Sequence, residues 1–432
     1  MPNILAGRVR WALIAWMFVI SATAYLDRVN ISIAGHSIEE EFHLTHLQLG
    51  WVFSAFVLGY ALCQAPGGRL ADRFGARNVL TVGTVWWAAF TALTAFVPAN
   101  LPNALATLLT VRFALGVGEA VVYPASNRLV ASWIPSQERG IANGLIFAGV
   151  GAGAGVTPPL ITYILLNHGW RWSFWICALI GLAVGAAWYF LARNRPDEHP
   201  WISPQEAAHI QSGLPPSTRT SENPLPWTTI LTSKNVLAIT VSYFCYGYVA
   251  YIFFTWFFIY LSSVRGLNLK ASAYYGMLPF IAMATCSPLG GWISDRLSKL
   301  YGRRIGRCWV ASVSIALCAI FVTLGPLAQD ARVASIILAG GAGALYLSQS
   351  SFWSVTSDIA GTSAGSVSGV MNMGNQIGGA VTASLTPLLA EHFGWAVSFF
   401  VAAGLCVLGS LMWLAVDPEG ELAPRRLEKV AV

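Results

Sequence analysis

Long apolar stretches, separated by short polar segments, follow one another along nearly the whole chain of 432 residues. Twelve of these stretches approach the ~20 residues that a helix needs to cross a hydrocarbon core of ~30 Å. They cover residues 11–35, 48–66, 78–98, 104–127, 141–165, 172–194, 235–262, 272–294, 308–327, 333–355, 368–390 and 394–416. The pattern predicts an all-α polytopic membrane protein with twelve transmembrane helices.

The composition agrees with this prediction. Hydrophobic residues make up 56% of the chain and charged residues only 10%, with a mean hydropathy of +0.60, whereas about 25% of the residues in a soluble domain are charged. With the N-terminus in the cytoplasm, 19 of the 25 Lys and Arg residues fall in cytoplasmic segments and four on the opposite side. The positive-inside rule therefore predicts that both termini are cytoplasmic. The net charge of +6 then reflects topology, and we expect no nucleic-acid partner.

The longest polar segment divides the predicted helices into six and six. This segment, residues 195–234, contains seven prolines, so most of it should be irregular. Ser203, followed three residues later by Glu206, predicts one short surface helix. We therefore expect an N-terminal six-helix bundle at 1–194, a cytoplasmic central loop, and a C-terminal six-helix bundle at 235–432.

A short motif occurs once in each half. The first copy follows the second predicted helix and reads Gly67-Gly68-Arg69-Leu70-Ala71-Asp72-Arg73. The second copy follows the eighth, 223 residues later, and reads Gly290-Gly291-Trp292-Ile293-Ser294-Asp295-Arg296. A repeat at half the chain length is expected of a transporter built from two related halves, with its substrate site between them near the bilayer midplane.

Four charged residues lie inside the predicted membrane segments: Asp27, Arg28, Arg112 and Glu119. Each charge costs roughly 2.5–3.5 kcal/mol at a helix centre, so it normally faces a partner or a water-filled cavity. Two acids and two bases form a matched set around a polar site within the membrane. Such a set predicts that an anion crosses the membrane together with protons.

The spacing of these residues is compatible with one site. Asp27 and Arg28 are about 100° apart on a helix, so both can border one cavity while facing different neighbours. Arg112 and Glu119 are separated by two turns, roughly 10 Å, on one helix face. The planar guanidinium of Arg suits a carboxylate, and moving it between an acid and a substrate can switch the acid's proton occupancy. The alternative is a static network of ion pairs between helices.

The motif resembles a known family signature. Gly68-Arg69-Leu70-Ala71-Asp72-Arg73-Phe74-Gly75-Ala76-Arg77 is similar to the loop between the second and third helices of the major facilitator superfamily. The family's second, degenerate copy corresponds to Gly291 to Arg296 followed by Gly302-Arg303-Arg304. In that family these loops latch the cytoplasmic side. The resemblance therefore implies gating roles for a set of six residues, namely Gly68, Asp72, Arg73, Gly291, Asp295 and Arg296.

Further segments are similar to one subgroup, the anion:cation symporters. They are Tyr25-Leu26-Asp27-Arg28-Val29-Asn30, residues 51–56 with Tyr60 and Gln64, Tyr123-Pro124 with Asn127-Arg128, Phe254-Thr255-Trp256-Phe257, and the loop at His199-Pro200. That subgroup includes bacterial galactonate, glucarate and hexuronate transporters and the animal sialin and vesicular glutamate transporters.

The resemblance implies roles for individual residues. Arg28 corresponds to the arginine that pairs with the substrate carboxylate, Asp27 and Glu119 to the proton-carrying acids, and Arg112 to their charge partner. Pocket-lining positions correspond to Tyr60, Ser350 and Asn372. One departure is Val150, which stands where sugar-acid transporters have a pocket glutamine.

The seventh apolar stretch is crowded with aromatic side chains, most of which must face lipid or core. Among them we expect Trp256 to be the first candidate for a wall of the pocket.

The sequence lacks the residue patterns that catalysis, metal binding or nucleotide binding would require. All seven His lie in loops or at predicted helix ends, and the seven Cys lie in or beside apolar segments without paired spacing. We find no catalytic set, metal-binding cluster or nucleotide-binding loop in the sequence, and expect neither an enzyme nor a cofactor.

Together the sequence predicts a secondary active transporter of the cell inner membrane that works as a monomer in the lipid bilayer. Its expected reaction is proton-coupled symport of a small organic anion by alternating access, with a sugar acid such as a hexonate, aldarate or hexuronate as the first substrate class. The alternatives are transport or exchange of another carboxylate (an aromatic acid or a dicarboxylate) and, from a different class, a substrate sensor that does not transport.

Overall fold

The computed structural model describes residues 8–214 and 224–422, and helices account for most of both ranges. In the first half the helices are α1 (Val9–Phe42), α2 (His46–Phe74), α3 (Ala76–Phe96), α4 (Ala104–Glu119), α5 (Val122–Trp133), α6 (Arg139–His168) and α7 (Trp170–Leu191). The central segment holds α8 (Pro204–Gly213) and α10 (Trp227–Leu231). In the second half they are α11 (Lys234–Tyr251), α12 (Phe257–Ile259), α13 (Leu269–Tyr301), α14 (Val310–Leu324), α15 (Ala331–Leu347), α16 (Gln349–Ala360), α17 (Ala364–Phe393) and α18 (Trp395–Met412).

The described residues contain 11 helical stretches long and apolar enough to cross a membrane. One of them, Ala331–Phe393, holds two passes, because a turn at Gly361–Ser363 separates α15 and α16 from α17, and α17 packs back against α16. Counted this way, the passes number twelve. The predicted all-α polytopic fold is confirmed.

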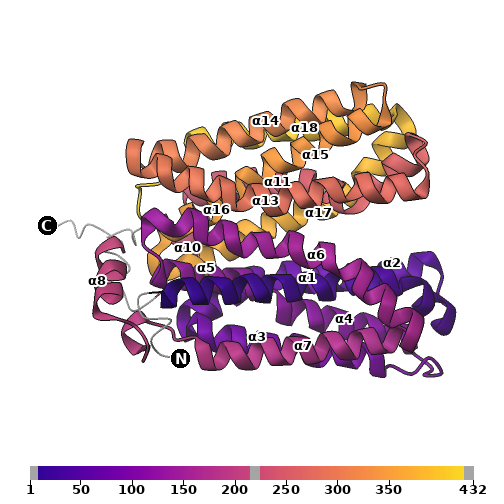
Figure 1. Cartoon of the computed structure of the whole chain (residues 1–432), viewed down its shortest axis with the longest axis horizontal. Coiled ribbons are helices and arrows are strands. Elements are labelled where there is room, and N and C mark those ends of the chain that lie inside the picture. The colour runs from indigo at the N-terminus through magenta and orange to yellow at the C-terminus, as the bar shows by residue number, and fades with distance from the viewer. Residues whose placement is uncertain (1–7, 215–223, 423–432) are drawn as a thin grey trace, which may run out of the picture.

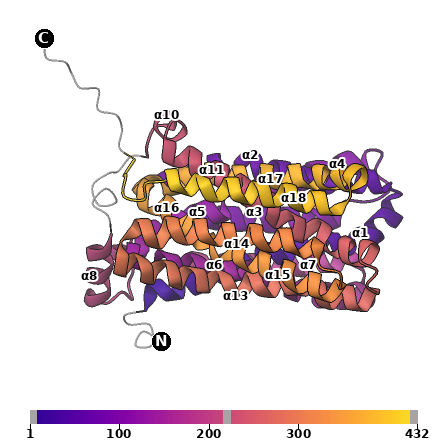
Figure 2. The same cartoon turned by 90° about the horizontal axis from the view of Figure 1, so that it is seen from above.

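The helices form two groups that lie side by side. Figure 1 shows α1–α7 in the lower group and α11–α18 in the upper group, which we call the first and second bundles. Figure 2, turned by 90°, shows the helices of both bundles running in a common direction. The bundles meet along α6 against α13 and along α2 against α17.

Four glycines show the relation between the two halves in the backbone itself. Gly75 and Gly169 begin α3 and α7 with φ of 84° and 86°, and Gly302 and Gly394 stand at matching turns with φ of 86° and 87°. Only glycine adopts such values without steric cost. Equal turns at equivalent places in each half are what the repeated motif predicts.

The central segment is attached to the first bundle at the end where α1 begins, at the left of Figure 1. Ser203 Oγ accepts a hydrogen bond from the Glu206 amide at 3.1 Å, which confirms the predicted start of α8. The buried Glu206 carboxylate in turn accepts from the Val9 and Arg10 amides at 3.1 and 3.2 Å. Glu206 therefore supplies the acidic cap that the sequence of α1 lacks. We call this end of the molecule the α8 end.

The loop before α8 is anchored by His199. Its Nε2–H donates to the Leu191 carbonyl at 2.9 Å, while Nδ1 accepts from the Trp201 amide at 3.2 Å, an arrangement that needs the neutral ring. Burial lowers the pKa of His199, which agrees with that neutral form. This histidine holds the loop in place.

Candidate functional site

A small cavity lies between the two bundles, halfway along their length. The space open to the centre of a water molecule is about 30 Å³, enough for roughly two waters. Its walls come from both bundles: Tyr25, Arg28, Tyr60, Tyr123, Phe147 and Val150 from the first, and Tyr243, Tyr246, Ala250, Tyr251, Phe254, Tyr346, Gln349, Asn372, Asn375 and Gln376 from the second. Seven of these are tyrosines, and the single charged one is Arg28.

The Arg28 guanidinium is held by an acid and by aromatic rings. Its Nε donates to Glu119 Oε1 at 2.5 Å, and Glu119 is fully buried. The guanidinium carbon lies 4.0 Å from the ring centre of Tyr60 and 5.0 Å from that of Tyr25, distances at which cation–π attraction holds it in place. Arg28 Nη2 and Glu119 Oε2 have no hydrogen-bond partner among the described residues. The ion pair thus keeps one free donor and one free acceptor.

The other two intramembrane charges do not line the cavity, although the Arg112 and Arg28 guanidinium groups lie over the same ring, that of Phe56. One oxygen of Asp27 accepts from Thr91 Oγ1 at 3.5 Å within the first bundle, and Asp27 does not line the cavity. Arg112 is buried with its guanidinium carbon 5.0 Å from the ring centre of Phe56, and within the described ranges it makes no ion pair within 4.0 Å. The structure therefore brings Arg28 and Glu119 together and leaves Asp27 and Arg112 in the surrounding core.

The expected pocket residues fall into two groups. Tyr60, Asn372 and also Val150 line the cavity. Ser350 is buried with an unpartnered hydroxyl but does not line it.

Trp256 packs 6.4 Å from Trp395, measured between ring centres, and Tyr251 and Phe254 form the aromatic wall in its place. The reason is local. Ile252–Trp256 is a π-helical turn, which adds a residue and rotates the side chains that follow relative to an α-helix.

Both repeated motifs contact the opposite bundle at the α8 end. The buried Asp72 carboxylate accepts from the amides of Gly365 and Ser366, at the start of α17, at 2.9 and 2.7 Å. Asp295 accepts from the amides of Gly140 and Ile141, at the start of α6, at 2.9 and 2.7 Å. In both cases a carboxylate caps a helix N-terminus, where unpaired N–H groups favour negative charge.

The motif glycines permit this close approach. A Cβ on Gly68 would lie 2.0 Å from the Gly365 carbonyl oxygen, and a Cβ on Gly291 would lie 2.2 Å from that of Gly140.

The motif arginines behave differently. Arg73 and Arg296 are exposed, and each guanidinium lies over an aromatic ring of its own helix, Phe74 at 5.5 Å and Trp292 at 5.8 Å. The acids and glycines of the motif thus form the interface in this conformation, while the arginines point away from it.

Three buried residues that the sequence analysis missed complete this interface. Asp358 pairs with Arg139 at 2.6 Å and with Arg307 at 3.5 Å. Arg307 also pairs with Asp295 at 2.7 Å, so the charges join both bundles. We call Asp72, Asp295, Arg139, Arg307 and Asp358 the gate network. It closes the α8 end beneath the cavity.

Neutralising Asp358 is expected to destabilise the protein. In Asp358→Asn, the buried Arg139 and Arg307 guanidinium groups lose a shared carboxylate, at a cost of about 3 kcal/mol in the free energy of unfolding. Denaturant titration of the purified protein would measure it. Asp197→Asn is the matched control, because the Asp197–Arg195 pair is exposed and such pairs contribute about 0–1 kcal/mol. Equal stability of the two variants would contradict the prediction.

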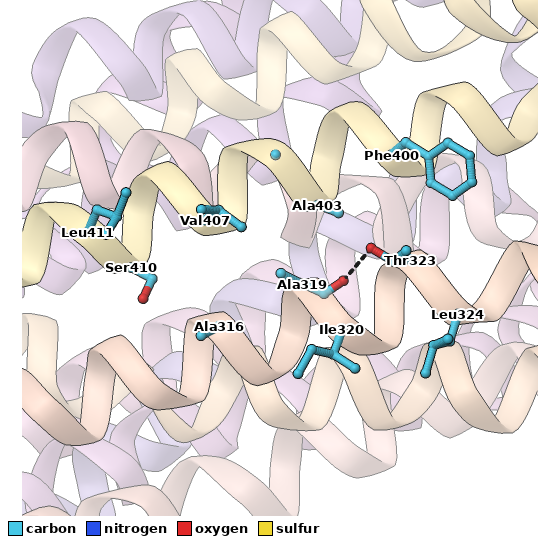
Figure 3. Close-up of a pocket in the computed structure, with 11 residues that line it drawn as sticks. Ala316, Ala319, Ile320, Thr323, Leu324, Phe400, Ala403, Val407, Ser410 and Leu411 are labelled. Carbon is cyan, nitrogen blue, oxygen red and sulfur yellow. Dashed lines mark hydrogen bonds between the residues drawn. The ribbon is translucent and has the colours of Figure 1, made fainter.

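A larger hollow lies elsewhere among the described residues, and its lining is mainly apolar. It lies between α14 and α18 and has a volume of about 790 Å³ (Figure 3). Alanines and large apolar side chains line most of it, and the hydroxyl of Thr323 is turned back to donate to the Ala319 carbonyl at 2.8 Å. A surface of this kind suits contact with hydrocarbon, so we place the candidate site at the Arg28 cavity.

Comparison with known families gives the architecture a name. Residues 17–383 match the family model described as Major Facilitator Superfamily, and a second match covers residues 298–431. The chain belongs to the major facilitator superfamily.

Among curated relatives, a probable sulfoacetate transporter of Cupriavidus necator is 34% identical over 413 residues, covering 95% of this chain and 94% of its own. The hexuronate transporter of Bacillus subtilis is 29% identical over 404 residues, covering 92% of each chain.

Solved structures of the same fold are known. A proton:xylose symporter bound to 6-bromo-6-deoxy-D-glucose aligns with a TM-score of 0.75 at 15% identity, covering 96% of this chain and 97% of its own. A Major Facilitator Superfamily transporter, FucP, in the outward conformation aligns with a TM-score of 0.70 at 15% identity, covering 95% of this chain and 99% of its own.

The family and the relatives confirm the coarser sequence predictions. The chain is an integral membrane transporter of anions of the major facilitator type and is not an enzyme. The likeness to anion:cation symporters is confirmed by relatives named as transporters of anions, hexuronate and galactarate or glucarate.

Proposed function

We propose that this protein is a secondary active transporter that moves a small organic anion together with protons by alternating access. The observation that carries the proposal is the Arg28–Glu119 ion pair at the central cavity, with a free donor on Arg28 Nη2 and a free acceptor on Glu119. The cavity presents one cation to a substrate. A carboxylate or sulfonate would bind there by charge-assisted hydrogen bonds.

Anion binding and protonation are linked in this arrangement. When an anion binds the guanidinium of Arg28 in place of Glu119, the Glu119 carboxylate loses its ion-pair partner while remaining fully buried. An unpaired buried carboxylate is costly, so Glu119 takes up a proton instead. The anion and the proton therefore favour each other's binding, which is the thermodynamic requirement for symport.

With a proton on Glu119, the site that holds a monoanion carries no net charge, whereas without the proton it would carry one negative charge through the membrane. The residues of the gate network would then have to separate for the α8 end to open. The proton and the anion would leave through this end. A potential of 100 mV adds about 2.3 kcal/mol per net charge moved. More than one proton per monoanion would therefore make accumulation electrogenic. Asp27 and Arg112 are proposed as the second proton carrier and its charge partner within the first bundle.

For the substrate class, a compact carboxylate or sulfonate is the first candidate. Val150, at the place where sugar-acid transporters have a pocket glutamine, favours an anion with few hydroxyl groups, and a relative 34% identical is named a probable sulfoacetate transporter. Sugar acids, which the sequence placed first, are the second candidate. They are supported by the hexuronate transporter, 29% identical, and by the amide side chains of α17 in the cavity.

A thermal-shift screen of the purified protein tests this proposal. The probes are sulfoacetate, short carboxylates, dicarboxylates, aromatic acids, glucuronate, galactonate and glucarate, each measured on the wild type and on Arg28→Ala. A binder of the proposed class should raise the melting temperature of the wild type and leave the variant unchanged. Stabilisation that persists in Arg28→Ala would contradict the proposed site. Counterflow in liposomes that ignores an imposed pH gradient would instead identify an exchanger.

The proposed setting is the cell inner membrane, with both termini and the α8 end in the cytoplasm and a monomer as the working unit. The basic residues of the gate network and of the motif loops then lie on the side that the positive-inside rule assigns to the cytoplasm. Labelling of single cysteines introduced at exposed helix ends, with a reagent that does not cross membranes, would test this orientation in intact cells.

A further inference from the structure

A chain of three amides crosses from the second bundle to the first at the cavity. Asn375 Nδ2 donates to Asn372 Oδ1 in a long contact of 3.5 Å, and Asn372 Nδ2 donates to Gln64 Oε1 at 3.0 Å. Gln64 is fully buried on α2. Its hydrogen bond with Asn372 therefore joins the first bundle to the second within the protein interior.

We call the three amides of Asn375, Asn372 and Gln64 the bridge. The same two helices, α2 and α17, continue from the bridge to the gate network. Asp72 caps the start of α17, Gly68 faces the Gly365 carbonyl, and a Cβ on Gly369 would lie 2.5 Å from the Gln64 carbonyl oxygen. Gln64 precedes Asp72 by eight residues, which is about 12 Å along a helix. One uninterrupted helix contact thus joins the bridge to the gate.

In the other direction, α2 leads to the charged site. Tyr60 lies one turn before Gln64, so both side chains point from the same face of the helix. The ring of Tyr60 stacks on the Arg28 guanidinium at 4.0 Å. A displacement of Arg28 or Tyr60 on anion binding therefore acts on the turn that carries Gln64.

A hydrogen bond between two buried amides contributes about 0.5–1.5 kcal/mol, so the Asn372–Gln64 bond favours the conformation in which the two bundles meet at the α8 end. We infer that Gln64 and Asn372 link the substrate site to the gate, with Gln64 as a positioning residue whose bond to Asn372 must break before the α8 end opens. This inference deepens the proposed alternating-access function and rests on it.

The inference is tested by distance measurements on the anion-free protein. Spin labels at Phe74→Cys and Leu300→Cys, two exposed positions near the ends of α2 and α13, report the separation of the bundles at the α8 end once the native cysteines are replaced. Gln64→Leu should lower the ratio of closed to open molecules about five- to tenfold, the effect of one buried hydrogen bond. Gln64→Asn, whose amide is too short to reach Asn372, should do the same and serves if the leucine variant does not fold.

Two further variants distinguish the loss of the Gln64–Asn372 hydrogen bond from a general disturbance of the fold. Gln376→Leu is the matched control, because its amide lines the same cavity but accepts from Tyr251 within the second bundle, at 2.7 Å. It should leave the distances unchanged. The double variant Gln64→Leu/Asn372→Ala should shift the ratio no further than either single change, since both remove one bond.

Unchanged distances in both Gln64 variants, an equal shift in Gln376→Leu, or additive effects of the two changes would each overturn the inference. Because this experiment uses neither an anion nor a pH gradient, its failure is distinct from failure of the Arg28 screen.

Discussion

Replacing Glu119 by glutamine is expected to abolish accumulation of the anion driven by a pH gradient, while exchange of labelled for unlabelled anion continues. Glutamine keeps the shape of the side chain but cannot bind or release a proton, and it leaves Arg28 free for the anion. Each coupled proton supplies about 1.36 kcal/mol per pH unit, which corresponds to tenfold accumulation. In liposomes with a gradient of one unit, the variant should show no accumulation, against about tenfold per coupled proton in the wild type.

Glu40→Gln provides the control for this measurement. Glu40 is an acid near the end of α1 that pairs with His36, with 69% of its side chain exposed, so its loss should leave accumulation unchanged. Full pH-driven uptake by Glu119→Gln would remove Glu119 from the coupling mechanism. Loss of exchange as well as accumulation would show that the residue is needed for folding or anion binding, and not for the proton alone.

The features that the sequence predicted well are those whose physical cost is set by the bilayer. A charge in an apolar helix is expensive wherever it lies, so Arg28 and Glu119 could be named as candidate site residues before their contact was known. The twelve passes follow from the same cost applied to the backbone. The cap of α8 by Ser203 follows from local geometry, because the side chain satisfies an amide three residues away.

Three members of the gate network, Arg139, Arg307 and Asp358, could not be predicted because their burial depends on the meeting of two bundles. In the sequence, Arg139 and Arg307 lie just outside apolar stretches and count as ordinary basic residues of cytoplasmic loops. Asp358 lies just beyond the predicted tenth helix. Only the contact between bundles makes all three fully buried and pairs them. Amphipathic periodicity within one helix carries no information about such a pairing.

Asp27 and Trp256 show how small rotations separate neighbouring residues. Asp27 adjoins Arg28 in sequence, yet a turn of about 100° directs it toward Thr91 inside the first bundle. Trp256 is the last residue of a π-helical turn and packs against Trp395 instead of the cavity. Packing within the first bundle places Asp27. The place of Trp256 depends on a backbone irregularity that composition does not reveal.

Replacing Arg28 by alanine is expected to weaken anion binding about 30- to 5,000-fold, because a desolvated charge pair contributes about 2–5 kcal/mol. Titration of the purified variant with a binder found in the screen, followed by calorimetry, would measure the change. Arg28→Lys should recover only part of the affinity, since an ammonium lacks the planar fork that binds a carboxylate through two parallel hydrogen bonds and stacks on Tyr60.

The single variant also leaves Glu119 buried without its partner, which by itself costs about 3–5 kcal/mol of stability. Weak binding could then reflect a disturbed fold. Arg28→Ala/Glu119→Gln removes both charges and should regain most of the lost stability, because no uncompensated charge remains. If the double variant is stable and still fails to bind, the guanidinium itself is the anion's partner. If binding returns with stability, the anion is held elsewhere, and Arg28 serves only to neutralise Glu119.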